Sequence, residues 1–385
     1  MVAGWCALAC LAWVLAGIRI IRNAAPLRML RDLHPPAPAA WPTLSVLVPA
    51  CNEAETLEPA MASLLAQDYP GLEIILVDDR STDGTAAIVD RLAARDPRVV
   101  PLHVGALHDG WLGKVQALAR ARERARGDWL LCTDADVHFA PGALRQVVAA
   151  TLESGAGHVA VIPAVPVRGF WLRTTIGAFS HALFLVLDGH RMGAPRSGIM
   201  MGVGACNLVR ASDLDASPGI GDLRMEVIDD VGLAQMLNRQ GTRGLLLGGA
   251  GCLSVAWYPT LGAMSRGLEK GAFAVTGFSA VKSIGSIMVV LAILGGLLAA
   301  PGVLPRSWGM VLACGGWAIY TAGGVAAARK MGSSGWLAPV APLGMVVTLW
   351  ISARSMWITL RRGGITWRGT FYPLAALRAG HRIRF

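Results

Sequence analysis

The sequence has no acidic residue after Glu269, although Lys and Arg continue to the end of the chain. This one-sided distribution carries the net charge of +10 over 385 residues. Basic residues that flank apolar segments are typical of contact with anionic lipid head groups. The chain contains no RNA- or DNA-binding motif, so we expect a membrane partner and no nucleic acid.

Two further absences narrow the function. The seven cysteines show no C-x-x-C spacing, so neither a disulfide framework nor a zinc site follows from them. No G-x-G-x-x-G and no G-x-x-x-x-G-K-S/T motif stands after the expected strands. This absence argues against a dinucleotide-binding fold and against a P-loop.

Hydrophobic residues make up 54% of the chain, which is too much for an ordinary soluble protein of this size. Residues 1–18 carry no charge and four arginines follow by residue 31. This pattern predicts a spanning helix over 1–21 whose C-terminal end is cytoplasmic. A cleaved signal peptide is the alternative, and it is disfavoured because the positive charges come after the apolar run. Residues 22–43 include a proline-rich stretch and are predicted to form a linker.

Residues 283–360 predict two or three further membrane helices. The uncharged stretches that are long enough to cross a bilayer are 283–305, 307–328 and 331–353. The third contains Pro339 and Pro342 and is alternatively a kinked or re-entrant segment. Three crossings would put the basic tail, 361–385, outside, whereas its six arginines favour the cytoplasm under the positive-inside rule. Either one stretch does not span, or the rule fails here.

Between these segments, strand and helix signals alternate from Leu44 to residue 256. Such alternation predicts an α/β domain with a mostly parallel sheet, in which ligands bind beyond the carboxyl ends of the strands. The next stretch, 257–282, interleaves apolar and aromatic residues with Arg266 and Lys270. This composition predicts a helix at the membrane surface, and a helix in the protein core is the alternative.

Acidic residues stand where three of the expected strands end. Asp134 and Asp136 follow the apolar run 130–132 and are one residue apart. Like charges and burial both raise the pKa of such a pair, and a bound Mg²⁺ or Mn²⁺ would remove that cost. The alternative is a purely structural role, in which the two aspartates are turn or helix-cap residues.

The acidic motifs lie at Val48–Glu53, Val77–Thr85, Thr133–Asp136 and Ile228–Ala234. With these motifs, the chain resembles the family 2 nucleotide-sugar glycosyltransferases, whose catalytic domain has the GT-A fold. The resemblance covers residues 44–274. Gly110–Lys114 and the flanking apolar segments are similar to the membrane-bound subgroup that acts on lipids, including hopene-associated and carotenoid glycosyltransferases. Thr366–Tyr372 is similar to a Trp, basic residue, Gly and Tyr pattern near the end of such proteins.

The resemblance implies a donor pocket around the first two motifs. Asp78 and Asp79 would contact the uracil and ribose of a UDP-sugar, and Glu53 and the backbone near Pro49 would line the same pocket. The alternative is that the two aspartates only cap the next helix and shape a turn.

The resemblance also implies a metal site and a base. Asp136 would be the firmer ligand of Mg²⁺ or Mn²⁺, with Asp134 as the second ligand, nearer to the ribose and sugar. Lys114 would offset the diphosphate charge, unless it is a solvated helix lysine. Asp230 would be the catalytic base beside Asp229, although the family usually has Glu-Asp here, which leaves open which carboxylate faces the acceptor. The alternative is a helix N-terminus that favours acidic residues.

These inferences predict an inverting, metal-dependent transfer of one sugar from a UDP-sugar to a membrane lipid at the cytoplasmic face. Gly202–Asn207 resembles the family's glycine-rich acceptor loop, with a plain turn as the alternative. A processive polysaccharide synthase is a rival, but Ala263–Gly267 stands where such enzymes have Gln-x-x-Arg-Trp. A membrane transport or binding protein is another, and it would need charges inside its spanning segments.

Overall fold

The computed structural model describes residues 1–333 and 335–384, so Phe385, the last residue of the expected tail, and Ser334 lie outside the described residues. Its centre is an eight-stranded sheet with the strand order β1-β9-β7-β8-β5-β2-β3-β4. Only β8 runs antiparallel to its neighbours; the other pairs are parallel. The strands are β1 (Arg28–Met29), β2 (Leu44–Ala50), β3 (Leu72–Asp79), β4 (Val99–Val104), β5 (Trp129–Cys132), β7 (His158–Ile162), β8 (Asn207–Arg210) and β9 (Gly244–Gly248).

Helices cover both faces of this sheet, and two apolar cores result. Alternate residues of β2 point to opposite faces, so Val46 joins one core while Leu47 joins the other. Because both faces are buried, the central strands are continuous apolar runs. The first core packs against α2 (Leu57–Leu65), α3 (Thr85–Arg95) and α5 (Ala143–Ser154); the second packs against α4 (Gly113–Arg124), α7 (Ala211–Asp215) and α8 (Asp229–Arg239).

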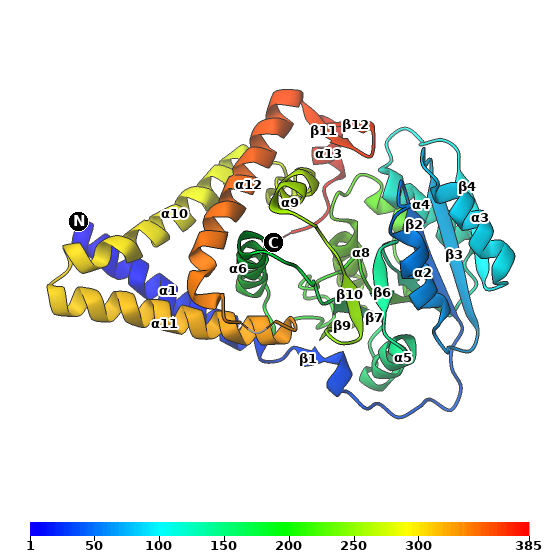
Figure 1. Cartoon of the computed structure of the whole chain (residues 1–385), viewed down its shortest axis with the longest axis horizontal. Coiled ribbons are helices and arrows are strands. Elements are labelled where there is room, and N and C mark those ends of the chain that lie inside the picture. Colours follow the sequence, from blue (N-terminus) through cyan, green and yellow to red (C-terminus); the bar gives the residue numbers. More distant parts are fainter. Residues whose placement is uncertain (334, 385) are drawn as a thin grey trace.

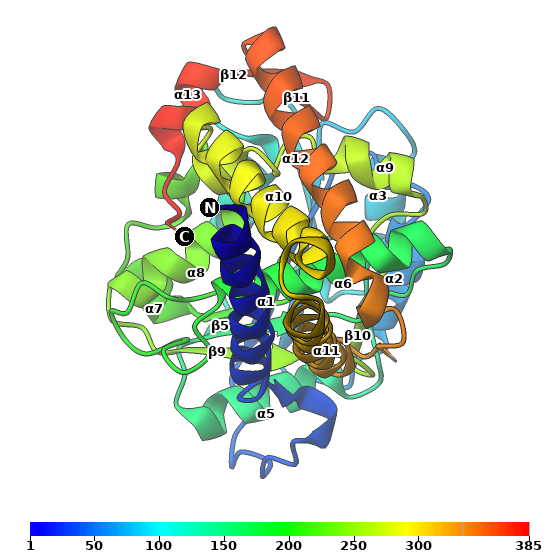
Figure 2. The ribbon, with the colours of Figure 1, turned by 90° about the vertical axis from the view of Figure 1, so that its left-hand side faces the viewer.

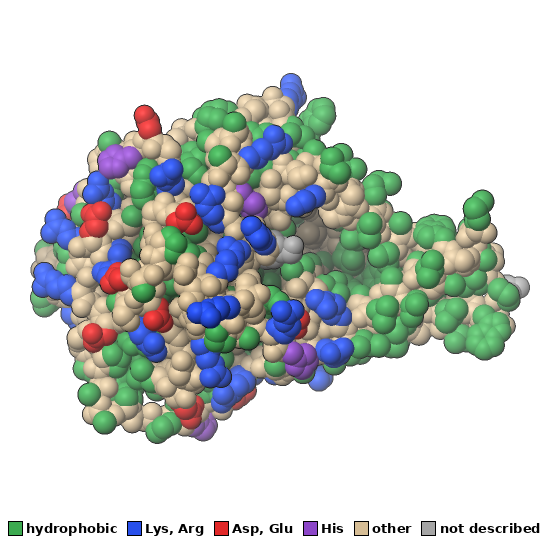
Figure 3. Space-filling view, turned by 180° about the vertical axis from the view of Figure 1, so that it is seen from behind, with side chains coloured by type: hydrophobic (Ala, Val, Ile, Leu, Met, Phe, Trp, Pro, Cys, Tyr) green, Lys and Arg blue, Asp and Glu red, His purple; other side chains and the backbone are tan. Residues whose placement is uncertain are grey.

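A layer of long helices projects from the domain (Figures 1 and 2). Helices α1, α10 and α11 pack along one another, and α12 packs against α6. Within the described part of the chain, four helices are long and apolar enough to cross a membrane, and hydrophobic side chains cover the projecting arm in Figure 3. The helices of this layer are α1 (Val2–Ala24), α6 (Phe170–Val186), α10 (Ala280–Val303), α11 (Arg306–Lys330) and α12 (Ala341–Arg362).

Two small sheets and several short helices complete the chain. Strand β6 pairs with β10, and β11 pairs with β12 in a hairpin that follows α12. Their bounds are β6 (Val137–Phe139), β10 (Leu253–Val255), β11 (Gly364–Trp367) and β12 (Thr370–Pro373). The short helices are η1 (Leu30–Asp32), η2 (Ile220–Leu223), α9 (Leu261–Gly267), η3 (Ala274–Thr276), η4 (Ala338–Val340) and α13 (Leu374–Gly380).

The expected α/β domain flanked by apolar helices is confirmed, but the single helix expected over 257–282 is not found. The stretch 257–282 is not one helix, because only Leu261–Gly267 is helical before a 3₁₀ turn, and α10 already begins at Ala280. The glycines at 267, 271 and 277 explain the interruption, since glycine is a poor helix former. The predicted linker 22–43 contains β1, which pairs with β9 and so adds a strand to the sheet edge.

After α11 the chain folds back along that helix before α12 begins. Gly335 lies against Val325, and Trp317, halfway along α11, donates from Nε1 to the carbonyl oxygen of Pro339 at 3.0 Å. Helix α12 starts there and ends beside the β11–β12 hairpin, next to the globular domain (Figure 1). Pro339 and Pro342 thus lie where the chain turns from α11 into α12.

Candidate active site

The site lies at the carboxyl ends of β2, β3 and β5, which form one edge of the sheet. The structure brings together there five carboxyl groups, which we name the carboxylate cluster: Glu53, Asp134, Asp136, Asp229 and Asp230. Strand β5 ends at Cys132 and delivers the Asp134/Asp136 pair, while the first turn of α8 delivers the other aspartate pair. A pocket opens between them, lined among others by Lys114, Cys132, Gly204, Leu223 and Leu233.

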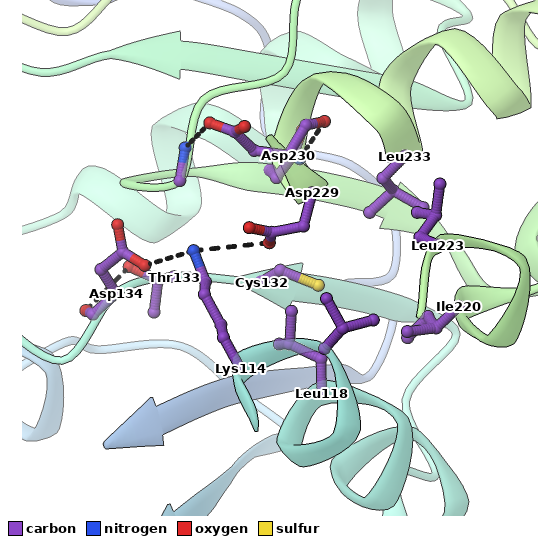
Figure 4. Close-up of a pocket in the computed structure, with 13 residues that line it drawn as sticks. Lys114, Leu118, Cys132, Thr133, Asp134, Ile220, Leu223, Asp229, Asp230 and Leu233 are labelled. Atoms are coloured by element: carbon purple, nitrogen blue, oxygen red, sulfur yellow. Dashed lines mark hydrogen bonds and ion pairs between the residues drawn. The ribbon is translucent and has the colours of Figure 1, made fainter. Parts of the chain in front are cut away.

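Lys114 joins the two aspartate pairs (Figure 4). Its Nζ lies 2.8 Å from Asp134 Oδ1 and 3.4 Å from Asp229 Oδ2. Burial alone would lower the pKa of Lys114, but the neighbouring carboxylates outweigh it and hold the pKa well above its usual value. Burial alone would likewise raise the pKa of Asp134, and Lys114 outweighs it and lowers that pKa. The alternative of a solvated helix lysine is wrong, because only 22% of the Lys114 side chain is exposed and the side chain points into the pocket.

Asp230 is held by the backbone. Its Oδ2 accepts the N–H of Gly204 and its Oδ1 accepts the N–H of Val231, both at 2.8 Å. Burial and the adjacent Asp229 carboxylate raise the pKa of Asp230 to about 6. A carboxyl group with such a pKa gains a proton more readily than an exposed aspartate, which is the property of a general base near neutral pH.

Glycine is required opposite these carboxylates. A β-carbon at Gly204 would lie 2.6 Å from Asp134 Oδ2, and a β-carbon at Gly202 would collide with the backbone carbonyl of Asp230. The loop that contains Gly202 and Gly204 therefore closely approaches Asp134 and Asp230. This finding gives the glycine-rich motif a steric reason.

Asp78 and Asp79 are the last two residues of β3. Asp79 accepts two bonds from Arg80, at 2.8 and 3.1 Å. Asp78 accepts the N–H of Ser81 at 3.3 Å and lies 3.3 Å from Nδ1 of His103. The N-cap residue of α3 is Gly84, and the carboxylate that accepts the N–H of Thr85, at 2.9 Å, belongs to Asp83. Asp78 therefore shapes the turn after β3, as the alternative expected, but neither aspartate caps α3.

A comparison with protein families identifies the domain. Residues 45–216 match the model of glycosyl transferase family 2. The chain carries a family 2 glycosyltransferase domain. The match confirms the resemblance over the first three acidic motifs, whereas Ile228–Ala234 lies beyond the matched residues. The sheet with its covering helices is the GT-A fold.

Curated relatives of the glycosyltransferase domain carry several activities in their names. A beta-monoglucosyldiacylglycerol synthase from Synechocystis sp. is 31% identical over 173 residues, which cover 42% of this chain and 36% of the relative. An N-acetylglucosaminyltransferase from Mesorhizobium japonicum is 33% identical over 130 residues, which cover 32% of this chain and 29% of the relative. The matched part thus spans about a third of the length of these relatives.

A solved structure shares the fold over nearly the whole chain. The mannosyltransferase PcManGT from Pyrobaculum calidifontis, solved in complex with GDP-Man and Mn²⁺, has a TM-score of 0.56 and 20% identity. The alignment covers 93% of this chain and 98% of that one. The likeness therefore extends from the glycosyltransferase domain to the apolar helices.

The residues of the glycosyltransferase domain fit a divalent cation only in part. Among residues 1–333 and 335–384, no group of three or more His, Cys, Asp or Glu side chains is arranged to hold a metal ion. Burial, Asp134 and Glu53 raise the pKa of Asp136 to about 6, so a nearby positive charge would stabilise its ionised form. Mg²⁺ is commonly held by one or two carboxylates together with substrate phosphates. Asp134 and Asp136 fit that partial ligand set.

The position of two basic side chains beside this cluster was not predicted from the sequence. Arg368, at the tip of the β11–β12 hairpin, forms an ion pair with Glu53. The Nζ of Lys270 lies 3.5 Å from the ring centroid of Trp367 in the same hairpin. Lys270 was expected in a helix at the membrane surface, and the motif Thr366–Tyr372 had no role assigned to it. Pro49 lies in β2, opposite Val77 of β3.

Proposed function

We propose that this protein transfers one sugar, with inversion, from a UDP-sugar to the hydroxyl group of a membrane lipid. The observation that carries the proposal is the position of Asp230, whose carboxyl group two backbone N–H groups hold close to Lys114, Asp229 and Asp134. A base, a cation and a metal-binding pair at one sheet edge are what displacement of a diphosphate requires.

Asp230 would accept the proton of the lipid hydroxyl as its oxygen attacks the anomeric carbon. The bond from that carbon to the diphosphate oxygen breaks, and the electron pair leaves with the diphosphate. Lys114 would stabilise the charge that develops there, because it is held as a cation. Asp134 and Asp136 would hold a Mg²⁺ or Mn²⁺ ion, which when bound would supply further positive charge to the leaving group.

The surroundings of Asp136 support an acceptor that comes from the membrane. Tyr258 lies near Asp136 and Asp134, and burial together with these carboxylates raises its pKa to about 12. Tyr258 packs on Trp257 with ring centroids 5.1 Å apart, and Trp257 packs on Phe179 of α6 at 5.3 Å. An aromatic path thus connects the site to the apolar helix layer. The name of the Synechocystis relative, a glucosyldiacylglycerol synthase, also favours a lipid.

The path of the chain supports a cytoplasmic tail. Lys330 at the end of α11 donates to the carbonyl oxygen of Leu27, just after α1, at 2.6 Å. The hairpin after α12 contacts Glu53 in the glycosyltransferase domain. If α1, α10 and α11 cross the bilayer and α12 re-enters from the domain side, domain and tail share one side. The six arginines of the tail then obey the positive-inside rule.

The test uses the full chain in detergent with UDP-sugars, Mn²⁺ and a total membrane lipid extract. The proposal expects release of UDP and a lipid carrying one sugar, detected by mass spectrometry, and both should fall at least a hundredfold for Asp136→Ala. A ladder of longer products would instead favour a polysaccharide synthase. Release of pyrophosphate, or near-normal transfer by Asp136→Ala, would refute the proposal.

A further inference from the structure

The tip of the C-terminal hairpin holds an arginine in an unfavourable backbone conformation. Trp367 pairs with Thr370, so Arg368 and Gly369 form a two-residue turn, with φ angles of +48° and +78°. Positive φ at both positions is the type I′ turn, which prefers Asn-Gly. An arginine is disfavoured there by the contact of its β-carbon with the backbone. Strained residues of this kind concentrate at functional sites, which directs attention to the guanidinium.

The hairpin is seated firmly on the glycosyltransferase domain. Ile365 and Tyr372 are buried in the core that also contains α4 and α8. The Tyr372 hydroxyl accepts the N–H of Gly113 at 3.3 Å, directly before Lys114, and Arg80 donates to Thr370 Oγ1 at 3.3 Å. These contacts fix where the turn lies, so the strained tip is held at the mouth of the site.

The guanidinium and a second cation face the carboxylate cluster from this side. Arg368 pairs with Glu53, which accepts the Thr56 hydroxyl through its other oxygen at 2.8 Å. Lys270 lies over the ring of Trp367 and has no ion pair to any carboxylate of the described residues. Burial and the nearby Lys114 lower the pKa of Lys270 to about 8. A partly buried cation beside another cation is stabilised by an anion.

We propose that Arg368 and Lys270 bind the diphosphate of the donor, and that Glu53 orients the guanidinium for this contact. The proposal rests on the proposed function, since it assigns residues to its donor. The planar guanidinium can bind two phosphate oxygens at once, and the ammonium adds a point charge opposite Lys114. Two residues far from Asp136 in sequence would then complete the donor site. Lys270 precedes the apolar helices α10 to α12, and Arg368 follows them.

The decisive variant is Arg368→Asn. Asparagine suits the first position of a type I′ turn better than arginine does, so the hairpin should keep or gain stability while the guanidinium is lost. A charge-assisted hydrogen bond to phosphate corresponds to roughly a tenfold loss of affinity or more when it is removed. Calorimetric titration of the full chain in detergent with Mn²⁺ should show UDP binding weakened about tenfold or more, with uridine binding unchanged.

Three further variants sharpen this test. Lys270→Gln should also weaken UDP binding and leave uridine binding unchanged. The UDP affinity of Arg368→Lys should fall between those of wild type and Arg368→Asn, because lysine keeps the charge and cannot bind two phosphate oxygens in the planar geometry of arginine. Arg120→Ala removes an arginine on the solvent-facing side of α4, where it pairs with Glu123. It serves as the matched control and should bind UDP as the wild type does.

Three results would overturn the inference, and one of them would also overturn the proposed function. Unchanged UDP affinity in Arg368→Asn overturns the inference and leaves the proposed function standing. An equal loss of uridine and UDP affinity also overturns it, because Arg368 would then support the shape of the pocket. If the wild-type protein binds none of UDP, GDP and ADP in the presence of Mn²⁺, the proposed function and the inference fail together.

Discussion

Replacing Asp230 by Asn tests the base most directly, because activity and stability should move in opposite directions. The folded protein raises the pKa of Asp230 from 3.8 to about 6. A group whose pKa is raised on folding contributes stability below pH 4, and this contribution is lost as the pH rises through about 6. At pH 7 the ionised carboxylate therefore destabilises the native state.

The magnitude follows from the shift and from the hydrogen bonds. Two pKa units correspond to about 3 kcal/mol, which asparagine would recover. Asparagine keeps one acceptor oxygen and loses one of the two bonds from Gly204 and Val231, which costs about 2 kcal/mol for a bond to a charged group. The variant should thus be about 1 kcal/mol more stable at pH 7, while kcat falls by roughly 10²- to 10⁴-fold with the loss of a general base.

The assay combines UDP release with thermal unfolding of the detergent-solubilised protein at pH 7 and pH 5. The stability difference between Asp230→Asn and wild type should be smaller at pH 5, where wild-type Asp230 is already largely protonated. Asp215→Asn is the control, since Asp215 pairs with Arg122 on the surface and should affect neither readout strongly. If Asp230→Asn keeps more than a tenth of the activity, or melts several degrees below wild type, Asp230 stabilises the start of α8 and is not the base.

Three further predictions follow from the same geometry. The rate should rise with pH through about 6 and then level off, because Asp230 must lose its proton to act; a limb near pH 4 would contradict this. Gly204→Ala should abolish transfer with little loss of secondary structure, since its β-carbon would lie 2.6 Å from Asp134 Oδ2; a tenth of wild-type activity would refute the close approach. Glu269→Gln should lower stability by about 2 kcal/mol, measured as a lower melting temperature, because Glu269 holds two arginines of α12 at 3.0 Å each.

Much of the sheet edge could be predicted from local sequence. Strands β2, β3 and β5 are short apolar runs that end at acidic residues, and parallel strands bring their carboxyl ends to one edge. The convergence of Asp134 with Glu53 near Asp136 follows from that rule. The positions of Asp229 and Asp230 at the first turn of α8 were also expected from their place before an apolar helical pattern.

Other elements could not be predicted because their local sequence points elsewhere. Strand β1 has two residues and lies in a stretch rich in proline and charge, so only its pairing with β9 defines it. The segment after Trp257 has the composition of a surface helix, yet its glycines and the contacts of Met264 and Phe273 with the domain break it into short turns. Packing overrode local pattern in both places.

Composition and short motifs were enough to predict the family of the domain, the apolar helices and the acidic residues after the strands. The pairing of Arg368 with Glu53 across 315 positions, the contacts of Lys114 with two aspartate pairs and the fold-back before α12 became visible only in the folded chain. Such pairings depend on the free energy of long-range packing, and no local pattern of residues records which distant side chains will share one pocket.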